Sequence, residues 1–204
     1  MCFNPRAGGC ISRAGFDDDE RFAHLSMLPT FRYHPDPIAT GSAKVSDAVC
    51  RCCGQTRGYI YAASVYARDS RRDFICPWCI ADGSAARKLE AMFSDADPLA
   101  QAGVPDEVIE EVTKRTPGYN SWQQEVWLSC CNDACEFHGD APRNELHALQ
   151  GEALAKTLTA WNWRERDCQR WPQFAQQYQP GGNPAVYKFV CRHCGAVKYA
   201  VDFT

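Results

Sequence analysis

The segment "FICPWCIADGSAARK", residues 74–88, places Cys76 and Cys79 with two residues between them, directly before the start of a predicted helix. A Cys-x-x-Cys pair of this kind is either a redox dithiol or one half of a metal site. The chain has 13 cysteines, so the positions of the other eleven decide between these interpretations.

An internal repeat identifies a second and a third Cys-x-x-Cys pair. The segments "AVCRCCGQTRGYIYAA" (48–63) and "FVCRHCGAVKYAVDF" (189–203) share Cys-Arg-x-Cys-Gly between two β-type runs. The repeat aligns Cys50 with Cys191 and Cys53 with Cys194, while Cys52 and His193 occupy the inner position and are interpreted as bystanders. A glycine follows each pair, and its freedom to adopt a positive φ turns backbone N–H groups toward a thiolate.

The first two pairs together make a complete set of four zinc ligands, listed as Cys50, Cys53, Cys76 and Cys79. Zinc favours four ligands in a tetrahedron, and two Cys-x-x-Cys turns about 20 residues apart supply them. The redox alternative is disfavoured because no thioredoxin-like βαβ pattern surrounds Cys76 and Cys79. We therefore predict a structural zinc site.

A second zinc site is predicted from "SCCNDACEFHG" (129–139) and the C-terminal pair. Its predicted ligands are Cys131, Cys135, Cys191 and Cys194. Cys130 is interpreted as a bystander directed to the core, and His138 is kept as an alternative ligand. Four thiolates leave no open position for water or substrate, so both predicted sites are structural rather than catalytic.

Composition narrows the class of protein. The net charge of −3 and the pI near 5.9 disfavour a general affinity for phosphates or anionic membranes. No apolar run approaches the roughly 18 residues of a membrane span, and the N-terminus lacks the apolar core of a signal peptide. A reducing, cytoplasmic location is therefore expected, where closely spaced cysteines indicate metal rather than the alternative of a disulfide scaffold.

The layout predicts an α+β fold with two zinc-knuckle β-hairpin modules, similar to zinc ribbons, joined by a helical segment. Residues 1–26 are expected to be a disordered tail or the product of an upstream start codon. Residues 27–204 form the predicted domain, with module one at 43–93, the helical segment at 94–120 and module two at 121–204. Within them, one helix is predicted in "PDEVIEEVTKRTPG" (105–118), with Pro105 in its first turn, acids at its start, bases at its end and Pro117-Gly118 as its stop. Another is predicted over 145–158, with Asn144 as its cap.

An ordered set of motifs resembles the CbrC family. The motifs are "LPTFRYHPDPIATG" (28–41), the knuckle ending in Gly54, "CPWCIADGSAA" (76–86), "TPGYNSWQQEVWLSCCNDACEF" (116–137) and "CRHCG" (191–195). The resemblance spans about residues 27–204 and implies a small bacterial protein without an established biochemical activity, named after a colicin E2 tolerance protein. The eight predicted ligands match the family's cysteine pattern. The leader, Cys52 and Cys130 have no place in it.

Three functions follow as hypotheses. The first is a non-enzymatic zinc protein that binds an unidentified protein partner through exposed aromatics, chiefly its six tryptophans. The alternative is a zinc-ribbon nucleic-acid-binding protein, in which Tyr59, Tyr61 and Tyr66 stack on bases within a stretch of Lys and Arg. The third is an enzyme in which His34 and Asp36 act as a base and its orienting group. No nucleophile or open metal site accompanies that pair, so the expectation is that the protein is not an enzyme.

Overall fold

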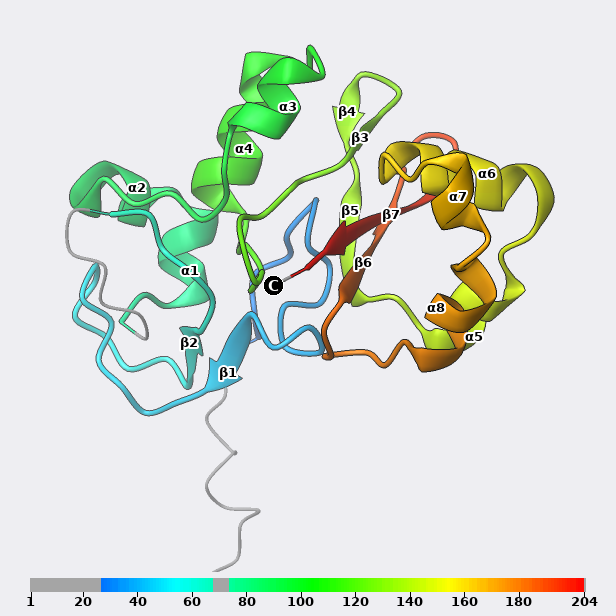
Figure 1. Cartoon of the computed structure of the whole chain (residues 1–204). Coiled ribbons are helices and arrows are strands. Elements are labelled where there is room, and N and C mark those ends of the chain that lie inside the picture. Colours follow the sequence, from blue (N-terminus) through cyan, green and yellow to red (C-terminus); the bar gives the residue numbers. More distant parts are fainter. Residues whose placement is uncertain (1–26, 68–73, 204) are drawn as a thin grey trace, which may run out of the picture.

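The computed structural model describes residues 27–67 and 74–203 (Figure 1). The expectation about residues 1–26 lies outside the described residues. In chain order the elements are β1 (Ala43–Val45), β2 (Tyr59–Tyr61), α1 (Pro77–Ala81), α2 (Ser84–Leu89), α3 (Asp97–Gln101), α4 (Asp106–Arg115), β3 (Ser129–Cys130), β4 (Asp133–Ala134), β5 (Glu136–Asp140), α5 (Arg143–Ala148), α6 (Gly151–Ala160), α7 (Glu165–Cys168), α8 (Trp171–Gln177), β6 (Ala185–Val190) and β7 (Val197–Asp202).

The described strands form three small antiparallel sheets: β1–β2, β3–β4 and β5–β6–β7. Figure 1 shows the three-stranded sheet between a group of elements at one side, β1, β2, α1 and α2, and the helices α5–α8 at the other. Short antiparallel sheets with helices between two cysteine-rich regions confirm the predicted α+β class. No helix of the described residues is long and apolar enough to cross a membrane.

The sheet β5–β6–β7 separates two of the hydrophobic cores. Side chains along a strand point to opposite faces in turn, so Tyr187 and Phe189 of β6 lie in a central aromatic core, while Val186 faces the opposite way. The helices α5–α8 cover that opposite face with Trp161 and Trp171. A third core belongs to the N-terminal part of the chain and contains buried cysteines among its members.

The helix predicted between Pro105 and Pro117 forms as α4, but it begins one residue after Pro105. The helix runs from Asp106 to Arg115, with two acids in its first turn, Lys114 and Arg115 in its last, and Pro105 at its N-cap. Acidic side chains at the start and basic side chains at the end stabilise a helix by interacting favourably with its dipole. These interactions involve only residues of the helix, so the sequence can predict them.

The single helix predicted over 145–158 is wrong, because the chain breaks it into α5 and α6. Leu149 and Gln150 between them are extended, and Gly151 starts α6 with a φ of +54°. Twelve positions separate Leu146 from Leu158, so on one straight helix their side chains would point about 120° apart. The break lets both side chains enter the same core against Trp161.

Gly118 marks a close approach between the segment after α4 and the N-terminal part of the chain. A Cβ at Gly118 would lie 1.7 Å from the carbonyl oxygen of Phe93. We expect Gly118→Ala to lower the free energy of unfolding by about 4 kcal/mol or more, because backbone atoms on both sides have to move.

Gly103→Ala is the matched control for that experiment. Gly103 has a φ of +70° but open space around its missing Cβ, so alanine adds only backbone strain of about 1–2 kcal/mol. Urea denaturation of both variants measures the difference. Equal losses would show that the approach at Phe93 does not constrain the chain.

Candidate metal centres

The two halves of the internal repeat form the same backbone turn. In the first knuckle (residues 50–54) the N–H of Gly54 donates to the carbonyl of Cys50 over 2.8 Å, and in the second (residues 191–195) that of Gly195 donates to Cys191 over 3.0 Å. The N–H groups of Cys50 and Cys191 each donate to the carbonyl five residues further on. Gly54 has a φ of +69° and Gly195 of +70°, as the sequence predicted.

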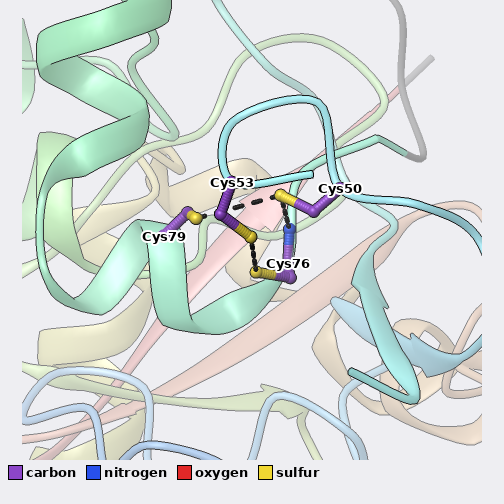
Figure 2. A group of neighbouring side chains, drawn as sticks. All are labelled: Cys50, Cys53, Cys76 and Cys79. Carbon is purple, nitrogen blue, oxygen red and sulfur yellow. Dashed lines mark hydrogen bonds between the residues drawn. The ribbon is translucent and has the colours of Figure 1, made fainter. Parts of the chain in front are cut away.

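Cluster one, defined as Cys50, Cys53, Cys76 and Cys79, brings the first knuckle against the start of α1 (Figure 2). Cys76 is the N-cap residue of α1, and Pro77 follows it in the first turn, where the fixed φ of proline favours the start of a helix. Cys79 lies one turn along the same helix. Cys53 is half-buried and the other three are buried, so all four cysteines predicted for this site come together.

The sulfur separations match a tetrahedral thiolate site. The Sγ atoms of Cys50 and Cys79 are 3.8 Å apart, and those of Cys53 and Cys76 are 3.9 Å apart. Four sulfurs about 2.3 Å from one central ion would be about 3.8 Å from each other. A disulfide needs about 2.0 Å, and all the described cysteines are free thiols.

Hydrogen bonds in cluster one shift the pKa values of its thiols in opposite directions. A hydrogen bond from the Cys76 thiol lowers the pKa of Cys50, and the backbone N–H groups of Cys76, Cys53 and Cys52 add to that effect. Sharing this proton raises the pKa of Cys76, and burial raises that of Cys79. Ionising all four thiols within 4.8 Å therefore calls for a cation between them.

Cluster two, defined as Cys130, Cys131, Cys191 and Cys194, joins a hairpin to the second knuckle. The strands β3 and β4 are linked by Cys131 and Asn132, with φ values of +54° and +58°. Two central residues with positive φ are the signature of a tight two-residue hairpin turn. The Sγ of Cys130 lies 3.8 Å from those of both Cys131 and Cys194, again a tetrahedral edge.

The structure brings Cys130, not Cys135, to this cluster, which corrects the set expected from the sequence. Cys135 follows β4 and is fully buried in the central aromatic core, where its carbonyl accepts a hydrogen bond from the Trp127 indole over 2.9 Å. Burial raises the pKa of its thiol to about 12. The sequence spacing favoured Cys131 and Cys135 as the ligand pair. The turn at Asn132 instead directs the adjacent Cys130 and Cys131 toward the same metal position. The pair Asn132-Asp133 was the available turn signal.

The remaining candidate ligands lie outside both clusters. Cys52 contacts the hydroxyl of Ser84 over 3.4 Å. His193 lies 2.7 Å from the carboxylate of Asp133, and His138 lies 3.3 Å from that of Glu136. Interpreting Cys52 and His193 as bystanders agrees with these positions.

The two clusters differ in exposure. Three cysteines of cluster one are buried, whereas Cys131 and Cys194 of cluster two are exposed and Cys130 is half-buried. In cluster two burial acts to raise the pKa of Cys191, but the N–H groups of Cys194 and His193 outweigh it and lower the pKa. Cluster two therefore offers accessible sulfurs beside a readily ionised one.

We expect a thiol-alkylating reagent, added to the folded protein without a chelator, to modify cluster two at least roughly tenfold faster than cluster one. Reaching buried sulfurs requires local opening, and each 1.4 kcal/mol of opening free energy slows reaction tenfold. Mass spectrometry of peptides from a time course measures both rates. Alkylation of the two clusters in parallel would contradict this order.

His34 and Asp36 do not form the general base and orienting carboxylate that the enzyme hypothesis needs. His34 is fully buried, with Nδ1 2.7 Å from the carbonyl of Pro117 and Nε2 2.7 Å from the hydroxyl of Thr40. Burial lowers the pKa of its ring to about 4. Asp36 instead accepts the N–H of Ala39 and closes a turn. His34 is thus a hydrogen-bonded core residue that joins this turn to the segment after α4.

The three tyrosines expected to stack on bases do not share one surface. Tyr61 is buried and packs edge-on against Phe93, with ring centroids 5.2 Å apart. The hydroxyl of Tyr66 donates to the carboxylate of Glu125. Tyr59 lies near the ring of Trp78, which the Arg57 guanidinium covers at 5.3 Å.

Comparison with known proteins identifies relatives over nearly the whole chain. The model of an uncharacterised protein family, UPF0167, matches residues 28–203. A UPF0167 protein of Pseudomonas aeruginosa is 52% identical over 178 residues, which is 87% of this chain and 98% of that protein. UPF0167 proteins of Mycobacterium bovis and Mycobacterium tuberculosis are each 40% identical over 178 residues, 86% of this chain and 94% of each protein. No solved structure matches.

Proposed function

The chain belongs to the uncharacterised protein family UPF0167, and from that premise we propose that it is a non-enzymatic protein with two structural Zn²⁺ ions, one in each cluster. The observation that carries this proposal is the pair of all-cysteine clusters with sulfur separations of 3.8–3.9 Å. Both clusters are compatible with metal binding, and zinc is the ion that four thiolates in a tetrahedron favour.

A structural rather than catalytic role follows from the donors. Catalytic zinc sites have three protein ligands, usually with His or a carboxylate among them, and keep one position for water. Each cluster supplies four sulfurs, and His193 and Asp133 beside cluster two bind each other. Bound zinc would join β3–β4 to the second knuckle, and the first knuckle to α1.

Metal analysis of the purified protein tests the proposal. We expect two zinc ions per chain by inductively coupled plasma mass spectrometry, matched by native mass spectrometry. One ion, none, or an iron–sulfur absorbance spectrum would refute it. Unfolding by a chelator without denaturant is also expected, because structural zinc binding is coupled to folding.

The biological role that we propose is binding to another protein. Among the tryptophans, Trp122 is the exposed one, with 55% of its surface accessible, whereas Trp127, Trp161 and Trp171 are buried. An exposed tryptophan is a frequent anchor of protein interfaces. The finer resemblance, to the CbrC family and its colicin E2 tolerance protein, would connect such an interaction to colicin sensitivity in the bacterial cytoplasm. In the described part of the chain, the three tyrosines of the nucleic-acid alternative do not form a common surface.

Affinity capture with matched variants tests the role. Wild type and Val45→Ala, which shortens a side chain that is 52% exposed, should recover the same protein, and Trp122→Ala should lose it. The recovered protein, once purified, should bind wild type directly and Trp122→Ala at least about tenfold more weakly. Failure to find any protein whose capture depends on Trp122 would count against this interface.

A further inference from the structure

A hollow of about 430 Å³ opens where the N-terminal part of the chain meets the sheet β5–β6–β7. Its lining includes Thr40 and Ala62, the segment around Trp122, and Asp140 and Tyr187. A second hollow of about 440 Å³ adjoins it and shares Asp140. These volumes are within the range of small-molecule sites.

A β-bulge in β5 places Asp140 at this hollow. Phe137 pairs with Phe189 and Asp140 pairs with Tyr187, so β5 has one residue more than β6 between these pairs. Gly139 occupies the bulge with a φ of +81°. Bulges of this kind redirect a side chain and occur often beside functional sites.

The carboxyl group of Asp140 has much unused hydrogen-bonding capacity. Among the described residues its hydrogen-bond donor is the backbone N–H of Gly181, and burial raises its pKa. The nearby Asp202 differs, because it accepts the hydroxyl of Ser121 at 2.5 Å and the N–H groups of Trp122 and Gln123 at 2.7 and 3.2 Å. An ionised carboxylate has about four acceptor positions.

Carboxylates predominate among the ionisable groups around Asp140. Asp140 is the charged member of the described lining of the first hollow, and the second hollow adds Asp36 and His138. The described lining of either hollow contains no Lys or Arg. The half-buried carboxylate of Asp140 therefore has no Lys or Arg partner in the described lining, and a bound cation would supply the opposite charge.

One exposed aromatic side chain, Trp122, lines the hollow together with the buried Tyr119, Phe137 and Tyr187. Tyr119 stacks on Phe137 with centroids 4.2 Å apart and lies 4.8 Å from the ring of Tyr187. The exposed Trp122 stands at the same hollow, with its indole N–H donating to the carbonyl of Gly182. Aromatic faces attract cations and pack against apolar groups.

We propose that this hollow binds an organic cation, an ammonium or guanidinium group on an apolar body, with Asp140 as the charge partner and Trp122 as the exposed aromatic surface. The same chemistry is presented by a free amine and by a Lys or Arg side chain of a peptide. The site requires neither bound zinc at the clusters nor the protein interaction proposed above.

Titration followed by ¹H–¹⁵N NMR tests this proposal with three probes. Phenethylamine represents a free amine, N-acetyl-lysine methylamide represents a peptide side chain, and phenethyl alcohol is the uncharged analogue of the first. At least one cationic probe should shift the signals of the Trp122 indole, Gly181 and Gly182, and phenethyl alcohol should bind at least about tenfold more weakly than phenethylamine if the amine is the ligand. The probe that binds more tightly identifies the source of the cation.

Asp140→Asn should weaken binding of the cationic probe by about tenfold or more, because the amide keeps an acceptor for Gly181 but loses the charge. Asp36→Asn is the matched control: it keeps the acceptor for Ala39 at the adjoining hollow, and binding should be unchanged within about twofold. No shift with either cation, binding of phenethyl alcohol as tight as that of the tighter-binding cation, or full affinity in Asp140→Asn would overturn the proposal. The comparison of probes on wild type decides even if that variant does not fold.

Discussion

Cys79→Ser is expected to remove one of two zinc ions per chain and to unfold the N-terminal core. Three cysteines of cluster one lie buried in that core, beside Ile60, Ile80 and Phe93. Structural zinc contributes about 10 kcal/mol or more of apparent binding free energy, and whole domains are stable by about 5–15 kcal/mol. Metal analysis and circular dichroism measure the loss of the ion and of the fold.

Cys52→Ser is the matched control, because it changes a cysteine of the same knuckle that lies outside the cluster. Cys52 is buried and contacts Ser84, and a serine hydroxyl preserves that contact. We expect two zinc ions per chain and a stability loss of about 1 kcal/mol. If Cys52→Ser lost metal as Cys79→Ser does, cluster one would not be the ligand set.

Cys130→Ser is expected to remove the zinc ion of cluster two and to leave that of cluster one. The Cys130 sulfur lies within 3.8 Å of those of Cys131 and Cys194, so its loss leaves three sulfurs and an open position. The expected stoichiometry is one zinc per chain. Because this ion joins the β3–β4 hairpin to the second knuckle, several kcal/mol of stability should be lost with it.

Cys135→Ala distinguishes this arrangement from the one expected from the sequence. Cys135 is a buried core residue outside the cluster, so alanine should cost about 1–2 kcal/mol for the lost packing and keep both ions. Native mass spectrometry of the two variants side by side gives the answer. Loss of an ion from Cys135→Ala, with two retained in Cys130→Ser, would restore the ligand set inferred from spacing.

The sequence predicted well where a feature depends on neighbouring residues. The knuckles 50–54 and 191–195 need two cysteines and one glycine, and both adopt the same turn with the same hydrogen bonds. The helix α4 has its start and stop signals between Pro105 and Gly118, and it forms there with its start displaced by one residue. Such elements form from local backbone preferences and local charge.

Prediction failed where distant contacts decided the outcome. The break between α5 and α6 lets Leu146 and Leu158 share a core that also contains Val186 and Tyr199, more than 25 positions further along the chain. His34 looked like a base beside Asp36, but its ring nitrogens bind Pro117 and Thr40 instead. The hydrogen bond to Pro117 spans 83 positions, and no short motif contains it.

The sequence by itself determined that cysteines gather in two groups, because ligand spacing and glycine position are written within each knuckle. Only the tertiary structure decided which cysteine completes the second group. Cys130 and Cys135 lie on either side of a tight turn, and the central aromatic core buries Cys135 while the turn presents Cys130. That choice depends on where apolar surface is buried, and burial is settled by the whole chain.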